Sequence, residues 1–147
     1  MKRLSFIARV STAVLSACLV WSSPLMAQEL IRIGAPLPIT GPLSPEAKKL
    51  QNGINLWVEA VNKVGGIKVG AKRMKVEVVY VDYQSNTPRA VQATERLITQ
   101  DKVDFMFSPF GSGAAKAASS VSDKYQMPTI AATASSEQVY DQGSKRS

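Results

Sequence analysis

The sequence predicts an α/β fold with a doubly wound parallel sheet, and two observations support this prediction. Short segments rich in β-branched residues alternate with longer segments in which apolar residues recur every three to four positions. Such alternation is typical of parallel strands joined by right-handed helical crossovers, with helices on both faces of the sheet. The chain has 147 residues, of which 45% are hydrophobic, which suffices for one domain with an apolar core.

The first strand, the first helix and the second strand follow from apolar spacing. Residues 30–35 form a short apolar run that is typical of a buried strand. After a turn-rich loop at 36–45, apolar side chains at helical spacing predict a helix from Glu46. Gly65-Gly66 ends that helix, because a helix C-terminus favours glycine. Residues 74–81 are rich in β-branched side chains and predict the second strand.

The second half of the chain repeats this order. Thr87-Pro88 is typical of a helix start, with Thr as the N-cap and Pro at the first helical position, and this helix is predicted to reach Gln100. The elements predicted after it are a strand at 103–107, a helix ending at Tyr125, a short strand at 128–131 and a helix start at 137–140.

The first 27 residues have the three-part layout of a secretory signal peptide. Three basic residues lie within the first nine positions, Val10–Trp21 is apolar, and the small residue Ala27 ends the segment. The apolar run is too short to stay in a bilayer as a spanning helix. We therefore expect a periplasmic protein in which residues 1–27 are removed and residues 28–147 form the exported domain.

The only cysteine, Cys18, supports an alternative to simple cleavage. Leu15-Ser16-Ala17-Cys18 resembles the lipobox of bacterial lipoproteins, in which the cysteine is acylated. However, the apolar run continues past Cys18, where a lipoprotein usually turns polar. We therefore expect cleavage after Ala27 rather than a lipid anchor. A single cysteine also excludes an intrachain disulfide.

Composition argues against several classes of function. The chain has no histidine, which removes a His-based catalytic triad and most zinc sites, and we expect neither a metal nor a cofactor. No nucleophile lies near a partner base, so catalysis is not expected. The net charge of +7 includes three cations at the extreme N-terminus, and the other basic residues are scattered, so nucleic-acid binding is not expected either.

Two predicted loops could bind a ligand, because a doubly wound sheet binds ligands beyond the carboxyl ends of its strands. In the loop 108–113, glycines precede a helix whose first N–H groups favour an anion. The loop 131–136 offers hydroxyls and free carbonyls, so the two loops together suit a zwitterionic amino acid. Three alternatives stay open: a phosphate site, although Lys116 stands where G-x-G-x-x-G has its third glycine, a tight turn that Ser112 only caps, and close packing of small residues.

A set of motifs then occurs in a recognisable order. They are Ile31–Gly34, Thr40–Leu43, Gln51–Gly53, Val61–Ile67, a strand ending in Asp82, Phe110–Gly113 and Met127–Ala131. This order resembles the type I periplasmic binding proteins of leucine/isoleucine/valine-type ABC transporters. The resemblance implies two α/β lobes that close on an amino acid or a related small solute such as an amide, a membrane permease as partner, and a monomer. A ligand-sensing domain of the same fold is the alternative.

The resemblance also implies site residues and an incomplete lobe. The position that holds the ligand carboxylate falls on Gly111, with Ser112 beside it, and Gly111 keeps the backbone N–H but lacks a hydroxyl. The hydroxyl position of the next loop falls on Ser135, and the carbonyl that accepts from the ligand ammonium falls on Thr133. Glu46 falls near a position that is often aromatic. Family members are much longer, so we expect a truncated lobe one that binds ligand weakly or not at all.

Overall fold

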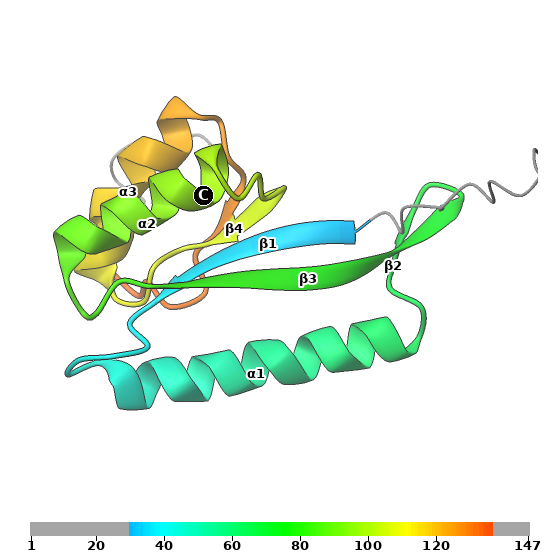
Figure 1. The fold of residues 1–147 in the computed structure, drawn as a ribbon, viewed down its shortest axis with the longest axis horizontal. Coiled ribbons are helices and arrows are strands. Elements are labelled where there is room, and N and C mark those ends of the chain that lie inside the picture. The colour runs from blue at the N-terminus through cyan, green and yellow to red at the C-terminus, as the bar shows by residue number, and fades with distance from the viewer. Residues whose placement is uncertain (1–29, 137–147) are drawn as a thin grey trace, which may run out of the picture.

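The computed structural model describes residues 30–136 (Figure 1). Its elements are β1 (Leu30–Leu37), α1 (Ser44–Lys63), β2 (Ile67–Val69), β3 (Lys72–Asp82), α2 (Thr87–Thr99), β4 (Phe105–Phe107), α3 (Ser112–Lys124) and β5 (Thr129–Ile130). The predicted signal peptide and the helix start at 137–140 lie outside the described residues. Among the helices within them, none is both long and apolar enough to cross a membrane.

The five strands form one sheet in the order β2-β3-β1-β4-β5. β1 lies in the centre and pairs in parallel with both β3 and β4, and β4 pairs in parallel with β5. In the β1–β3 pair, the register runs from Leu30 opposite Lys75 to Leu37 opposite Asp82. The predicted α/β class and the parallel pairing of the four predicted strands are therefore confirmed.

The edge strand β2 was not predicted, and it departs from the all-parallel pattern. It pairs antiparallel with β3 through a hairpin at Gly70, whose φ is +60°. Gly66 makes the approach to this hairpin feasible: its φ is +96°, and a Cβ there would lie 2.0 Å from the carbonyl oxygen of Met74. Only glycine allows the chain to leave α1 this close to the backbone of β3.

Helices cover the two faces of the sheet unequally. α1 runs along one face beneath β1 and β3, whereas α2 and α3 lie side by side on the other face (Figure 1). On the α1 face, Ile33 and Val76 form a buried cluster with side chains of α1. On the opposite face, Leu97 and Met106 belong to a second cluster. A Cβ on Gly34 would lie 2.5 Å from the Met106 sulfur, so this glycine admits the second cluster close to β1.

The helix starts differ slightly from the prediction. α1 begins at Ser44, with Pro45 in its first turn, two residues before the predicted start at Glu46. The N-cap of α2 is Asn86 and not Thr87, because the Asn86 side chain accepts a hydrogen bond of 3.0 Å from the Arg89 N–H. An asparagine satisfies an exposed helix N–H as well as threonine does, so the sequence pattern alone did not decide between these neighbours.

Candidate functional site

Four loops gather at one end of the sheet, because the strands before them are parallel and end together (left in Figure 1). They are residues 38–43, 83–86, 108–111 and 131–136, which follow β1, β3, β4 and β5. This is the edge at which the sequence predicted a ligand site.

The loops after β1 and β3 are joined by a clamp of hydrogen bonds around Asp82. The Asp82 carboxylate accepts from the Thr40 hydroxyl at 2.7 Å, from the Thr40 N–H at 3.2 Å and from the Gln84 N–H at 2.8 Å. The Ser85 hydroxyl donates to the Thr40 carbonyl at 3.0 Å and accepts from the Leu43 N–H at 3.1 Å. Burial by itself raises the pKa of Asp82, but the hydrogen bonds from Thr40 and Gln84 outweigh it and hold that pKa below its ordinary value.

Tyr83 joins the loop after β3 to the loop after β4. Its side chain is 1% exposed and packs against Ala90, Ala93 and Ala114. Its hydroxyl donates to the Phe110 carbonyl at 2.7 Å, which places the loop that leads into α3. Burial, together with the charge of Asp82, raises the pKa of Tyr83 to about 12. The phenol therefore stays protonated and able to donate at neutral pH.

The N-terminus of α3 has no side-chain cap. Its N-cap residue is Gly111, with φ +86°, and within residues 30–136 no side chain bonds to the first helical N–H groups. There is also no acidic residue in the first turn, and a Cβ on Gly111 would meet no atom within 4 Å. Ser112 is the first residue of the helix, so the alternative in which Ser112 caps it is wrong. These N–H groups lie at the positive end of the helix dipole and can donate hydrogen bonds to an external anion.

The loop after β5 packs against this helix start. Ala134 is buried against Ala115, which lies in the first turn of α3. The segment that contains Thr133 and Ser135 therefore adjoins the first turn of α3, which begins at Ser112. Adjoining segments of two loops thus supply backbone N–H groups, hydroxyls and carbonyls.

Two buried hydroxyls at this edge have no hydrogen-bond partner among residues 30–136. They belong to Thr133, which the sequence indicated, and to Ser108, which it did not. Ser108 is 6% exposed and follows β4 directly. An unpaired buried hydroxyl costs about 1–3 kcal/mol, so both side chains are poised to donate to a bound group. A serine at the first position after a buried strand was the signal available in the sequence.

Glu46 lies apart from these two loops. It stands in the first turn of α1, on the opposite face of the sheet from α3. Its carboxylate forms an ion pair of 2.8 Å with Lys49, and both side chains are more than half exposed. Tyr80, another polar residue of this region, donates to the side chain of Asn55 at 2.7 Å.

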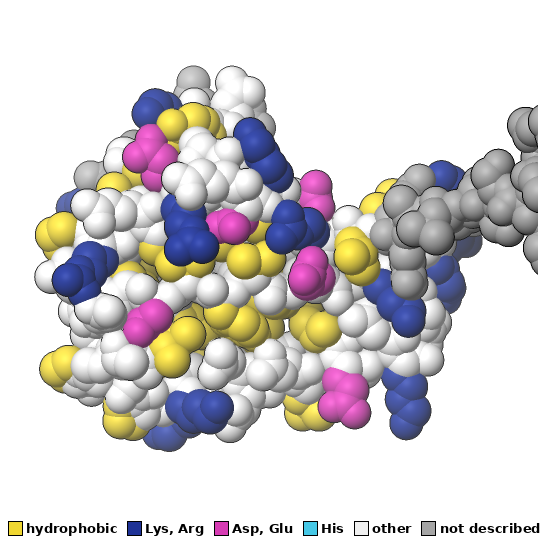
Figure 2. All heavy atoms as spheres, in the orientation of Figure 1, with side chains coloured by type: hydrophobic (Ala, Val, Ile, Leu, Met, Phe, Trp, Pro, Cys, Tyr) yellow, Lys and Arg dark blue, Asp and Glu magenta, His cyan; other side chains and the backbone are white. Residues whose placement is uncertain are grey.

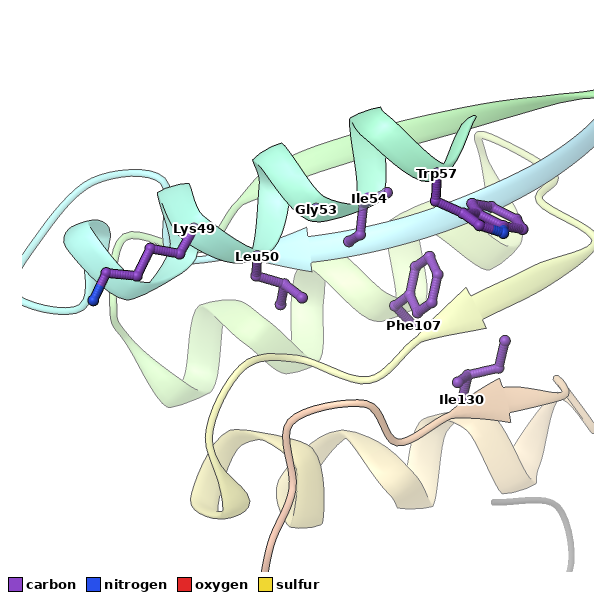
Figure 3. A pocket seen from close by; sticks show the side chains of 7 residues that line it. All are labelled: Lys49, Leu50, Gly53, Ile54, Trp57, Phe107 and Ile130. Carbon is purple, nitrogen blue, oxygen red and sulfur yellow. The ribbon is translucent and has the colours of Figure 1, made fainter. Parts of the chain in front are cut away.

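A separate hollow of about 550 Å³ opens between α1 and the β4–β5 side of the sheet (Figure 3). Its lining residues are Lys49, Leu50, Gly53, Ile54, Trp57, Phe107 and Ile130. The hollow lies over the α1 face of the sheet, and Phe107 and Ile130, which line it, are the last residues of β4 and β5. Within residues 30–136, no three acidic or cysteine side chains come together in a way that could hold a metal ion.

Comparison with known proteins gives a consistent likeness. A family model described as "Periplasmic binding protein" matches residues 30–145. Among curated proteins, the Leu/Ile/Val-binding protein homolog 7 of Brucella melitensis is 30% identical over 128 residues, which are 87% of this chain and 30% of that protein. The same homolog of Brucella abortus is 31% identical over 113 residues. The chain thus spans less than a third of the length of these curated relatives.

Solved structures give the same picture. The branched-chain amino acid transporter substrate-binding protein LivJ of Streptococcus pneumoniae, in complex with isoleucine, is 32% identical with a TM-score of 0.71. The match covers 78% of this chain and 32% of that one. A solute-binding protein of an ABC transporter from R. palustris, in complex with benzoate, is 28% identical with a TM-score of 0.63, over 75% of this chain and 29% of that one.

Proposed function

Because the chain belongs to the periplasmic binding protein family, we propose that it contributes the first part of lobe one to the solute-binding component of an ABC importer. In this proposal residues 1–27 direct export to the periplasm, and residues 28–147 belong to the lobe. A membrane permease is the partner that receives the solute. The relatives named above are solute-binding proteins, and this supports a role in binding and not in catalysis.

We propose a small carboxylate-bearing solute, such as an amino acid, as the ligand. The N-terminus of α3 carries this proposal, because no side chain of the described residues caps its first N–H groups and the loop after β5, which contains hydroxyls, packs against its first turn. Isoleucine and benzoate, the ligands of two structural relatives, differ in shape but share a carboxylate. The carboxylate is therefore the chemical group that these N–H groups would recognise.

Each proposed contact follows from the position of the residue. The N–H groups that follow Gly111, including that of Ser112, bind the carboxylate, and the Ser112 and Ser135 hydroxyls add donors. The carbonyl of Thr133 accepts from the ammonium of an amino acid. The buried hydroxyl of Ser108 is a further donor from below. Glu46 lies on the other face of the sheet, so in this proposal it contacts the solute only at the rim, at the part remote from the carboxylate.

Two substitutions at one position test this proposal by separating the hydroxyl from the backbone donor. Ser112→Ala removes only the hydroxyl. Ser112→Pro also removes the N–H, at a first helical position that tolerates proline. The ψ of Gly111, 139°, suits a residue that precedes proline.

The measurement is an NMR titration of the full chain with L-isoleucine, with benzoate and, as the control, with isoleucine amide. We expect weak binding, in the millimolar range for a half-formed cleft, with shifts in the amides of residues 111–114 for both carboxylates only. Ser112→Ala should keep these shifts and Ser112→Pro should lose them. Equal shifts in both variants would refute the N–H assignment, and submicromolar affinity by calorimetry would contradict the expectation of a half-formed cleft.

A further inference from the structure

The net charge of the described residues comes from one short segment. Residues 30–136 contain thirteen basic and eight acidic side chains. Five of the basic residues and none of the acidic ones lie within positions 63–75, so the remaining eight and eight balance. The five are Lys63, Lys68, Lys72, Arg73 and Lys75, and all are exposed. Such an asymmetry favours an anionic partner at this segment.

This segment, which we term the basic hairpin, comprises the end of α1, β2 and the start of β3 (residues 63–75). It projects at the end of the sheet opposite the four ligand loops, and dark blue side chains mark that end of the surface (Figures 1 and 2). The Arg73 guanidinium donates to the carbonyls of Val64 and Gly66 at 3.2 and 2.8 Å, which fixes the hairpin against the helix end. The cations are thus displayed on a defined structure.

Two aliphatic side chains stand exposed among these cations. Val64 is 67% exposed and Val69 is 48% exposed. Cations around exposed aliphatic groups match the boundary between anionic headgroups and acyl chains. The segment 63–75 contains no aromatic side chain on which a base could stack, so a nucleic acid fits it less well.

In the unprocessed chain, before residues 1–27 are removed, the start of β1 supplies a second argument. Residues 1–29, which include the apolar run Val10–Trp21, join the sheet at Leu30. Leu30 pairs with Lys75, so that segment joins the sheet at the basic hairpin. We propose that the basic hairpin is a docking surface for a bilayer containing anionic phospholipid. The inference is independent of the identity of the solute.

Vesicle cosedimentation of the full chain tests this surface, with residues 1–29 kept in every variant so that their contribution is constant. Vesicles of phosphatidylcholine are compared with vesicles of phosphatidylcholine mixed with phosphatidylglycerol. The test variant replaces Lys63, Lys68 and Lys75 with Gln. The matched control replaces three exposed lysines elsewhere with Gln: Lys48, Lys102 and Lys124.

We expect the test variant to lose roughly tenfold to a hundredfold in partitioning onto the anionic vesicles, from the contribution of each lysine near such a surface. The control should change by less than about threefold, and salt should weaken binding of the unmodified chain by screening. An equal loss in the control, or equal binding to both kinds of vesicle, would overturn the proposal. A further variant, V64S/V69S, should also bind anionic vesicles more weakly. If it does not, the partner is a soluble polyanion and the lipid assignment is wrong.

Discussion

Replacing Tyr83 with Phe removes one hydroxyl from the link between the loops after β3 and β4. The hydroxyl donates to the Phe110 carbonyl at 2.7 Å from a ring that is 1% exposed. Losing a hydrogen bond lowers the free energy of unfolding by about 0.5–1.5 kcal/mol, and leaving the buried carbonyl partner unpaired can raise this loss toward about 3 kcal/mol. We expect the free energy of unfolding at pH 7 to fall by about 1–2 kcal/mol.

The effect of Tyr83→Phe on the free energy of unfolding should change sign at high pH, from destabilising to stabilising. The pKa of Tyr83 is about 12 in the folded chain, against an ordinary value of 10.0. Because the pKa of Tyr83 is higher in the folded chain than in the unfolded chain, the stabilisation of the fold by the protonated hydroxyl is complete below pH 10 and is lost as the pH rises through 12. The two-unit difference corresponds to roughly 2.7 kcal/mol. The stability curves of the unmodified chain and Tyr83→Phe should therefore cross between pH 10 and pH 12.

Urea unfolding at a series of pH values measures this crossing, because lysine titration is common to both proteins and cancels in the comparison. Tyr80→Phe is the matched control. Burial also raises the pKa of Tyr80 to about 12, but the Tyr80 hydroxyl donates to the side chain of Asn55 in α1. Only Tyr83→Phe should alter the NMR shifts of the loop 108–111. Parallel stability curves across the alkaline range would refute the reasoning, since they would show that the Tyr83 hydroxyl is not buried in the folded chain.

Three further substitutions, the first with a control in α1, test the supports of the ligand loops. Gly41→Ala should lower the free energy of unfolding, measured by thermal unfolding, by about 1–3 kcal/mol, because φ is +90° and the new Cβ would lie 2.7 Å from the Ser85 hydroxyl. Gly53→Ala in α1, where a Cβ would meet no atom within 4 Å, should instead raise it by up to about 1 kcal/mol. Equal effects of the two substitutions would be inconsistent with this prediction. Asn86→Ala should cost about 1 kcal/mol in chemical unfolding through the lost cap of α2, and no loss would argue against that cap. Asp82→Asn should lower the free energy of unfolding by about 1–2 kcal/mol at pH 7. Because the pKa of Asp82 is lowered in the folded chain, this difference from the unmodified chain should be present above pH ~4 and vanish as the pH falls below it. A difference that persists in acid would contradict the hydrogen bonds assigned to the Asp82 carboxylate.

Long elements were predictable because their apolar spacing extends over several turns or strand residues. α1 and α2 were predicted to within two residues at their starts, since each repeats an apolar face of the helix. β2 was missed because only three residues form it, one of them half-buried. So short a segment shows no period, and its pairing depends on the backbone approach that Gly66 allows.

The site divides in the same way. The bare helix start at Gly111 was predictable, because glycine and small residues after a strand have a local meaning. The clamp between Thr40 and Asp82 was not, since it joins residues 42 positions apart through the register of two strands. Tyr83 was missed because its importance lies in burial, which only the packed structure shows, and Ser108 was missed although its place directly after a buried strand was a signal in the sequence.

The hollow beneath β4 and β5 implies a gradient in local unfolding. β1 lies between α1 on one face and α2 on the other, whereas Ile130 on β5 is 50% exposed and its strand has only two residues. Cooperative units with few buried contacts open first, so amide protons of β1 and β3 should exchange with solvent far more slowly than those near β5. Opening at β5 would release the loop that carries Thr133 and Ser135 while leaving the Asp82 clamp intact. One part of the ligand edge, the Asp82 clamp, is thus attached to strands expected to exchange slowly, and the other part, the loop with Thr133 and Ser135, to a strand expected to exchange fast.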